Sequence, residues 1–122
     1  MSRSASRASG RRGRRAIVVL VTCPTLASAK RIAVRVVELR LAACVNLLPG
    51  VQSWFRWQGR IERAREALLL IKTTAESFEP LRQTVLQAHP YDVPEIIALP
   101  VTAGHAPYVA WIAESVARRL LS

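Results

Sequence analysis

A chain of 122 residues has the length of one domain, and its hydrophobic content of 51% is enough for a packed core. No apolar run approaches the ~20 residues that span a bilayer, so we expect a soluble, cytoplasmic protein without a membrane partner. The formal net charge of +10 is concentrated at one end, where six arginines and no acidic residue occur in the first fifteen positions.

Residues 1–15 are rich in serine, arginine and glycine, and they contain too little apolar surface to order themselves. We expect a solvated, disordered tail, with contact to nucleic acid or to an anionic surface, or a role as a transit peptide, as alternatives. Residues 16–122, the predicted domain, carry twelve basic and eight acidic residues. The folded part is therefore only mildly basic.

The two cysteines, Cys23 and Cys44, are too few for a disulfide framework. In the absence of an export signal we expect free thiols in a reducing compartment. Cys44 lies between two apolar residues and is expected in the core.

The first predicted elements are a strand and a helix. Residues 16–22 form a continuous apolar and β-branched run, which is typical of a central strand covered on both faces. Pro24 ends this run, and Thr25 can cap the next element. Apolar side chains then recur at helical spacing over 26–41, with charged residues on the other side.

A long antiparallel hairpin is predicted next. A strand begins near Ala43, is interrupted at Pro49-Gly50 in the manner of a β-bulge, and resumes over 51–58. Gly59-Arg60 turns the chain, and a third strand follows over 61–74.

The remaining pattern predicts a helix over 77–88, a strand over 95–101 and a helix over 107–121, with Pro107 in its first turn. The order β-α-β-β-α-β plus a C-terminal helix predicts an α+β, ferredoxin-like sandwich. Both helices of such a sandwich cover the same face of the sheet, so its other face and its edges need a different cover.

Three aromatic residues, Trp54, Phe55 and Trp57, crowd the tip of the predicted hairpin. A monomer could not easily hide this apolar surface, so we expect the chain to associate with copies of itself.

Residues 89–95 place a histidine, a tyrosine and two carboxylates within seven positions, and Pro90 and Pro94 stiffen the backbone. Ionisable groups on a rigid connector between a helix and a strand indicate a candidate site. The alternative is a plain turn with a histidine at the helix end. His105 follows Gly104 and is expected to be a solvated turn residue.

Many short stretches, spread in order over about 16–116, resemble the CutA family of divalent-cation tolerance proteins. They are Val21-Thr22-Cys23-Pro24, Leu41-Ala42-Ala43-Cys44-Val45-Asn46, Leu48-Pro49-Gly50-Val51, Ser53, Trp57-Gln58-Gly59, Ile71-Lys72-Thr73-Thr74, His89-Pro90-Tyr91, Pro94-Glu95, Pro100-Val101, Gly104, Tyr108 and Trp111-Ile112. The resemblance implies a homotrimer like the PII-type signalling proteins, and a role in the response to copper and other divalent cations by binding or signalling rather than by catalysis.

In some bacterial members of this family, copper is held by a cysteine of the first strand and by two consecutive histidines. Those positions correspond here to Val21 and Ala88, with only His89 retained. The candidate metal ligands are therefore His89, with Glu95 or Cys23 contributing, and the expected ion is copper or another divalent cation that folding does not require.

A second hypothesis uses Lys72, Tyr91 and Trp57 to line a cleft between subunits that binds a small anionic metabolite, because a lysine can neutralise a carboxylate or phosphate. The alternative for Lys72 is a structural ion pair with Glu95 across the interface between subunits.

Two other classes of protein share the predicted order of elements. RNA-binding modules need stacking aromatic residues in the third strand, and residues 66–72 contain none, so we expect no specific nucleic-acid partner. Acyl-phosphate hydrolases need a loop that holds an anion, and residues 23–28 contain neither glycine nor arginine. We therefore expect no enzymatic activity.

Overall fold

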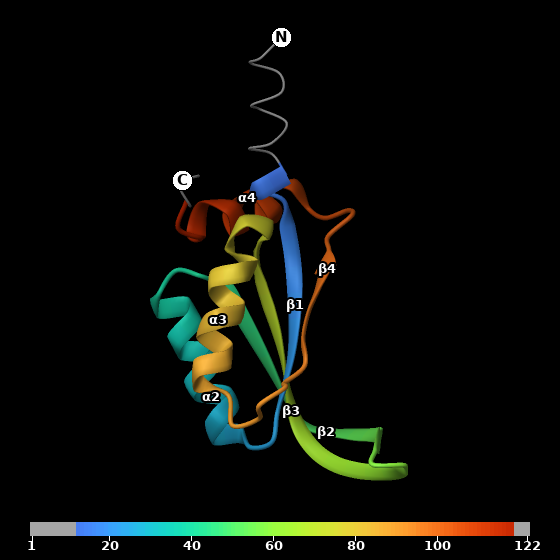
Figure 1. Cartoon of the computed structure of the whole chain (residues 1–122). Helices are drawn as coiled ribbons and strands as arrows, with labels where there is room; N and C mark the ends of the chain where they lie inside the picture. The colour runs from blue at the N-terminus through green and yellow to red at the C-terminus, as the bar shows by residue number, and fades with distance from the viewer. Residues whose placement is uncertain (1–11, 119–122) are drawn as a thin grey trace.

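The computed structural model describes residues 12–118. These residues form an α+β fold in the order β-α-β-β-α-β with a C-terminal helix, as predicted (Figure 1). The elements are β1 (Ala16–Cys23), α2 (Leu26–Glu38), β2 (Cys44–Trp57), β3 (Arg60–Thr74), the 3-10 turn η1 (Ala75–Ser77), α3 (Phe78–Ala88), β4 (Ile96–Pro100) and α4 (Ala106–Ser115).

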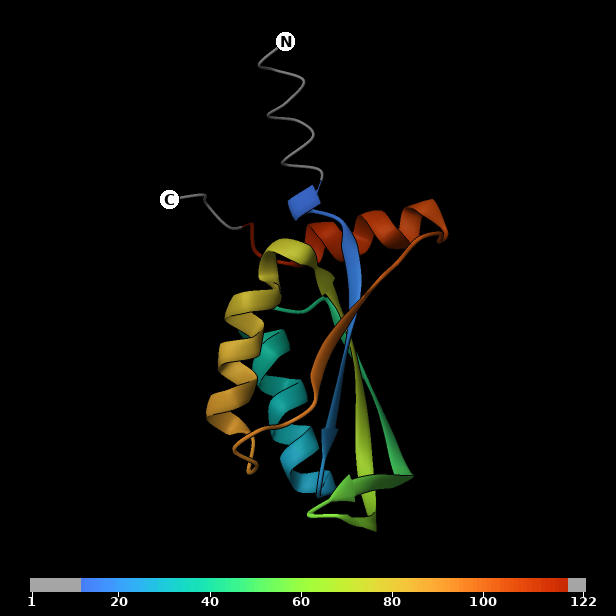
Figure 2. The ribbon, with the colours of Figure 1, turned by 45° about the vertical axis from the view of Figure 1, so that its right-hand side comes forward.

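The four strands form one sheet in the order β2-β3-β1-β4, and each neighbouring pair is antiparallel. Helices α2 and α3 lie side by side on one face of this sheet, whereas α4 lies across one end of it (Figure 2). Among the described residues, no helix long and apolar enough to cross a membrane is found.

Helix α2 begins where a capping box satisfies its first free backbone groups. The Thr25 hydroxyl accepts a hydrogen bond from the backbone N–H of Ser28 at 3.0 Å, and the Ser28 side chain faces the Thr25 backbone in return. The helix ends at Glu38 rather than at the predicted residue 41. Arg40 adopts a left-handed φ of 57°, and the N–H groups of residues 41 and 42 turn back to the Val36 carbonyl.

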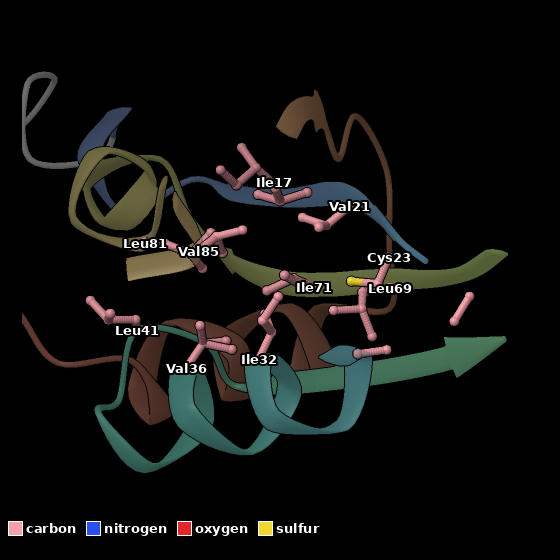
Figure 3. Packing of buried hydrophobic residues seen from close by; sticks show 14 residues of the cluster. Ile17, Val21, Cys23, Ile32, Val36, Leu41, Leu69, Ile71, Leu81 and Val85 are labelled. Carbon is pink, nitrogen blue, oxygen red and sulfur yellow. The ribbon is translucent and has the colours of Figure 1, made fainter. Parts of the chain in front are cut away.

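The core lies between the sheet and helices α2 and α3 (Figure 3). Its fully buried side chains come from alternate positions of β1 and β3 and from one stripe of each helix. The principal members are Val19, Val21, Leu69, Ile71, Ile32, Val36, Leu81 and Val85. Burial of each such side chain contributes roughly 1.5–3 kcal/mol, which makes this layer the main source of stability.

The other face of the sheet carries the intervening side chains, and we call it the open face. Register places Leu20 opposite both Leu70 and Ile97, and Val18 opposite Leu99. Leu48 and Leu68 form the next pair, so apolar side chains cross all four strands. Ile97 and Leu99 are each 50% exposed, so the described chain leaves this apolar face largely uncovered.

The hairpin of β2 and β3 contains the predicted bulge. Its register shifts between Leu48 and Val51, and Gly50 lies in the left-handed region with a φ of 70°. The turn is formed by Gln58 and Gly59, one residue earlier than predicted, because both have positive φ as a two-residue hairpin turn requires. Beyond the bulge the hairpin bends away from the sheet (Figures 1 and 2).

Helix α4 is shorter than predicted, since it ends at Ser115 and Val116 is extended. Arg40 contacts this end of the helix. Its side chain donates to the carbonyls of Glu114 and Ser115, and its own carbonyl accepts from the N–H of Ala117 at 2.9 Å. Predicted helical positions 119–121 lie outside the described residues.

The end of the predicted tail contacts the domain. Arg14 forms an ion pair with Glu76 at 2.6 Å and also donates to the carbonyl of Ala113. The Arg15 carbonyl accepts from the N–H of Ala75. Residues 1–11 lie outside the described residues, so disorder of the tail stays a prediction.

Cys23, at the end of β1, is fully buried. Burial raises the pKa of its thiol from the ordinary value of 9.0 to about 11, and the nearby carboxylate of Glu66 adds to this rise. Because the folded state favours the protonated thiol, this stabilisation is complete below pH 9 and is lost as the pH rises toward 11.

We therefore expect the free energy of unfolding of the wild-type chain to fall between pH 9 and pH 11 more steeply than that of Cys23→Ala, by on the order of 2 kcal/mol. Urea unfolding under reducing conditions measures both slopes, and Cys44→Ala controls for the loss of a thiol elsewhere. An equal fall in the free energy of unfolding with pH for the wild type and Cys23→Ala would contradict the raised pKa of the Cys23 thiol.

Candidate ligand groove

At the end of the open face, the bent hairpin and the segment before β4 enclose a groove of about 1210 Å³. We call it the hairpin groove. Its walls come from β1, from the two hairpin strands and from residues 90–95. The lining residues are Thr22, Ser53, Trp54, Phe55, Trp57, Glu62, Arg63, Glu66, Pro90, Tyr91, Asp92, Val93 and Glu95.

The groove is acidic, although the domain as a whole is mildly basic. Four acidic residues are among its lining, namely Glu62, Glu66, Asp92 and Glu95. The one basic residue is Arg63, whose side chain lies with Trp54 on the face of the hairpin opposite Glu62 and Glu66. Glu62 and Glu66 are separated from Leu68 and Leu70 by an even number of positions along β3, so all four side chains point to the open face. Acidic residues therefore outnumber basic ones in the lining of this groove.

Aromatic rings form much of the remaining wall. Trp54 and Trp57 are 62% and 60% exposed, so their rings are available to a ligand or to a partner. The guanidinium carbon of Arg63 lies 6.0 Å from the centre of the Trp54 ring, within the range of a cation–π contact. Burial raises the pKa of Tyr91, and the negative charge of Glu66 adds to the rise.

His89 lies behind the groove and is only 7% exposed. Its Nδ1 accepts a hydrogen bond from the backbone N–H of Tyr91 at 3.0 Å, so Nδ1 carries no proton. Its Nε2 therefore donates to the Thr22 carbonyl, at 2.7 Å. The imidazole fastens the segment after α3 to the end of β1, and both of its nitrogens are already in use.

The predicted site residues are brought together only in part. Trp57, Tyr91 and Glu95 line the groove, and His89 and Cys23 lie behind it. Within residues 12–118, no group of three histidine, cysteine or acidic side chains is close enough to hold a metal ion. The metal site of His89, Glu95 and Cys23 stays a prediction.

Lys72 lies apart from the groove, since it is paired with Val18 and Cys44 farther along the sheet. Its amine contacts the side-chain oxygen of Asn46. Within residues 12–118 of one subunit no ion pair joins Lys72 and Glu95, so the pair across the interface between subunits stays a prediction.

The two remaining candidates, His105 and Cys44, do not line the hairpin groove. His105 is exposed, as expected, and precedes the first residue of α4. Cys44 is half-buried and points to the open face from β2, so its predicted core position is wrong. The cause is strand alternation, which points Val45 and not Cys44 toward the helices.

Sequence reasoning missed the two groove glutamates of β3. The signal that could have found them is the pattern Ile61-Glu62-Arg63-Ala64-Arg65-Glu66. Its period of two places both glutamates on one face of the strand and both arginines on the other.

Comparison with known proteins agrees with this fold. Residues 17–115 match the family model described as CutA1 divalent ion tolerance protein. The chain is 49% identical to the divalent-cation tolerance protein CutA of Thermus thermophilus, over 80% of this chain and 95% of that protein. It is 50% identical to human Protein CutA over 75% of this chain, which spans 51% of that longer protein.

Solved structures show the same similarity. The divalent cation tolerance protein of T. thermophilus aligns with a TM-score of 0.82 at 47% identity, covering 84% of this chain and 99% of that one. CutA1 of Oryza sativa aligns with a TM-score of 0.84 at 40% identity, covering 86% and 96%.

The names of relatives differ in compartment. The Arabidopsis thaliana relative is called chloroplastic and the Archaeoglobus fulgidus relative periplasmic, so the cytoplasmic location stays a prediction. The family name refers to ion tolerance and not to a catalysed reaction, in agreement with the expectation of a protein that is not an enzyme. The sequence match and the shared fold together show that this chain belongs to the CutA1 divalent ion tolerance family.

Proposed function

We propose that this chain acts in the tolerance of divalent cations by binding them as a homotrimer. The observation that carries the proposal is the excess of acidic residues in the lining of the hairpin groove, four against one basic residue, directly in front of His89. Such a surface raises the local concentration of cations. Membership of a divalent ion tolerance family supports the same ligand class.

The proposed ligands for copper are His89, Glu95 and Cys23, because imidazole, carboxylate and thiolate all bind this ion. Binding to His89 has to replace one of its two hydrogen bonds, and binding to Cys23 has to remove a proton held with a pKa of about 11. Both requirements weaken the site, and the second makes affinity increase with pH.

Calorimetric titration of copper and of zinc into the full chain, under nitrogen at neutral pH, tests these ligands. We expect His89→Gln to bind at least ~10-fold more weakly, because it loses the imidazole while its amide can still donate to the Thr22 carbonyl. His105→Gln, on the exposed second histidine, is the matched control and should bind as the wild type does. Equal affinity in the wild type and His89→Gln would exclude His89 as a ligand.

The homotrimer is supported by two features of the sheet. Its open face carries partly exposed leucine and isoleucine side chains across all four strands, which is unusual for a surface in contact with water. The outer edges of β2 and β4 also lack a partner strand within the described chain. Self-association would cover the apolar face and would also give the edge strands a partner.

We expect Ile97→Asp to shift the chain to smaller species in size-exclusion chromatography with light scattering. Ile97 is half exposed in the single subunit, so the charge costs little there, whereas burial against a neighbouring subunit would cost several kcal/mol. Val34→Asp, on the 58% exposed outer side of α2, is the control and should leave the mass unchanged. A trimer that persists in Ile97→Asp would contradict an interface on the open face.

A second candidate function is the binding of a small anionic metabolite between subunits. The observation in its favour is that Lys72 points to the open face and forms no ion pair within residues 12–118. Tyr91 and Trp57 line the hairpin groove, and Lys72 of the same subunit does not. In such a site these two residues would therefore come from a neighbouring subunit.

Inorganic phosphate is the simplest probe of this candidate. If the site exists, phosphate should raise the melting temperature of the wild-type chain and not that of Lys72→Gln. An equal effect of phosphate on both proteins, or no effect on either, would remove the candidate.

A further inference from the structure

The outer side of the bent hairpin carries several arginines around an exposed tryptophan. Beyond the bulge, alternate side chains of β2 and β3 point to the side of the sheet that carries the helices, because directly paired residues share a face. Five of them, which we call the arginine face, are Gln52, Trp54, Arg56, Arg63 and Arg65. We propose that the arginine face binds single-stranded nucleic acid without sequence preference. This function is separate from the metal binding proposed above.

The arginine face lies outside the surface that the homotrimer would cover. Arg63 and Arg65 have the parity of Leu69 and Ile71, which point to the helices, whereas the interface proposed above lies on the open face. Pairing of the free edge of β2 with a neighbouring subunit would use backbone N–H and C=O groups in the plane of the sheet, so it would leave the arginine face uncovered. Helices α2 and α3 do not cover it either, because the hairpin bends away beyond the bulge (Figures 1 and 2). All five residues are exposed.

The positive charge of the arginine face is not compensated by the acidic residues of the hairpin. These are Glu62 and Glu66, and both point to the open face. Within residues 12–118, no ion pair involves Arg56, Arg63 or Arg65. Their guanidinium groups can therefore form paired hydrogen bonds with a phosphate group, for which the planar guanidinium has a matching geometry.

The spacing of the arginines suits an extended phosphate backbone. Neighbouring side chains on one face of a strand are about 6.6 Å apart, because each residue advances the chain by about 3.3 Å. Successive phosphates of an extended single strand are separated by a similar distance. A hollow of about 470 Å³ lies beside Arg63 and Arg65, with Gln52 and Ala64 as its other lining residues. This hollow has room for a phosphate group in contact with the arginines.

Trp54 favours nucleic acid over other polyanions as the ligand. The residue is 62% exposed, and the guanidinium carbon of Arg63 lies 6.0 Å from its ring centre. A base can stack on the free surface of this ring while the neighbouring phosphates contact the arginines, a combination that is typical of proteins that bind single strands. An anionic membrane surface offers the same charge but no base to stack.

Fluorescence anisotropy of a labelled oligothymidine, titrated with the full-length chain at several salt concentrations, tests the proposal. We expect Arg63→Gln/Arg65→Gln to bind at least ~10-fold more weakly at physiological salt. The slope of log affinity against log salt concentration should be shallower by about 1.4, because each lost phosphate contact on a single strand removes about 0.7. The matched control is Arg31→Gln/Arg35→Gln on the exposed side of α2, which removes the same charge and should bind as the wild type does. All variants keep residues 1–15, so any binding by those arginines is common to all of them.

A second variant separates base stacking from charge. Trp54→Leu should weaken the binding of oligothymidine and leave unchanged the affinity for inorganic polyphosphate, which has the charge but no bases. Vesicles that contain phosphatidylserine should not compete with oligothymidine for the wild-type chain.

Equal affinity of Arg63→Gln/Arg65→Gln and its control for oligothymidine would assign binding to the net charge or to residues 1–15, and would overturn the proposal. Unchanged oligothymidine binding in Trp54→Leu, or an equal loss of polyphosphate binding, would exclude stacking, and competition by the vesicles would indicate a membrane surface instead. Size-exclusion chromatography with light scattering should give every variant the mass of the wild type. A smaller species in Arg63→Gln/Arg65→Gln would place the arginine face in the subunit interface and would also contradict the proposal.

Discussion

The alternation of side chains along β1 and β3 is the constraint on which the rest of this molecule depends. Val21 and Leu69 point into the helix-covered core, and their neighbours Leu20 and Leu70 point to the open face. A shift of register by one residue would exchange the two faces completely. The same pairing therefore fixes the core, the uncovered apolar face and, farther along β3, the direction of the groove glutamates.

This geometry explains how a basic domain presents an acidic groove. Basic residues outnumber acidic ones in the sequence, yet alternation along β3 places Glu62 and Glu66 on one face and Arg63 and Arg65 on the other. Net charge describes the average field at a distance, whereas a ligand in the groove responds to the few charges that line it. The cation binding proposed above rests on this local separation of charge, whereas the overall charge would have suggested an anionic ligand.

His89 joins the core to the groove. It is the C-cap residue of α3, hydrogen-bonds the Thr22 carbonyl near the end of β1 and accepts from the backbone N–H of Tyr91. These contacts give the histidine a structural function whether or not it also binds a metal. Cys23 is similar in this respect, since its buried thiol belongs to the core while its pKa responds to a carboxylate of the groove.

The sequence by itself determined the order of elements, the bulge at Pro49-Gly50 and the inward stripes of α2 and α3, because these depend on local periodicity and on the backbone limits of proline and glycine. It also placed Trp57, Tyr91 and Glu95 among the candidate site residues, and all three line one groove.

Only the tertiary structure decided the rest. The last carbonyls of helix α4 accept from Arg40, which is distant in sequence, and both ring nitrogens of His89 are engaged by Thr22 and Tyr91. Lys72 is separated from the groove by its register with β1. Each of these outcomes depends on contacts between segments far apart in the chain, which periodicity along the sequence does not encode.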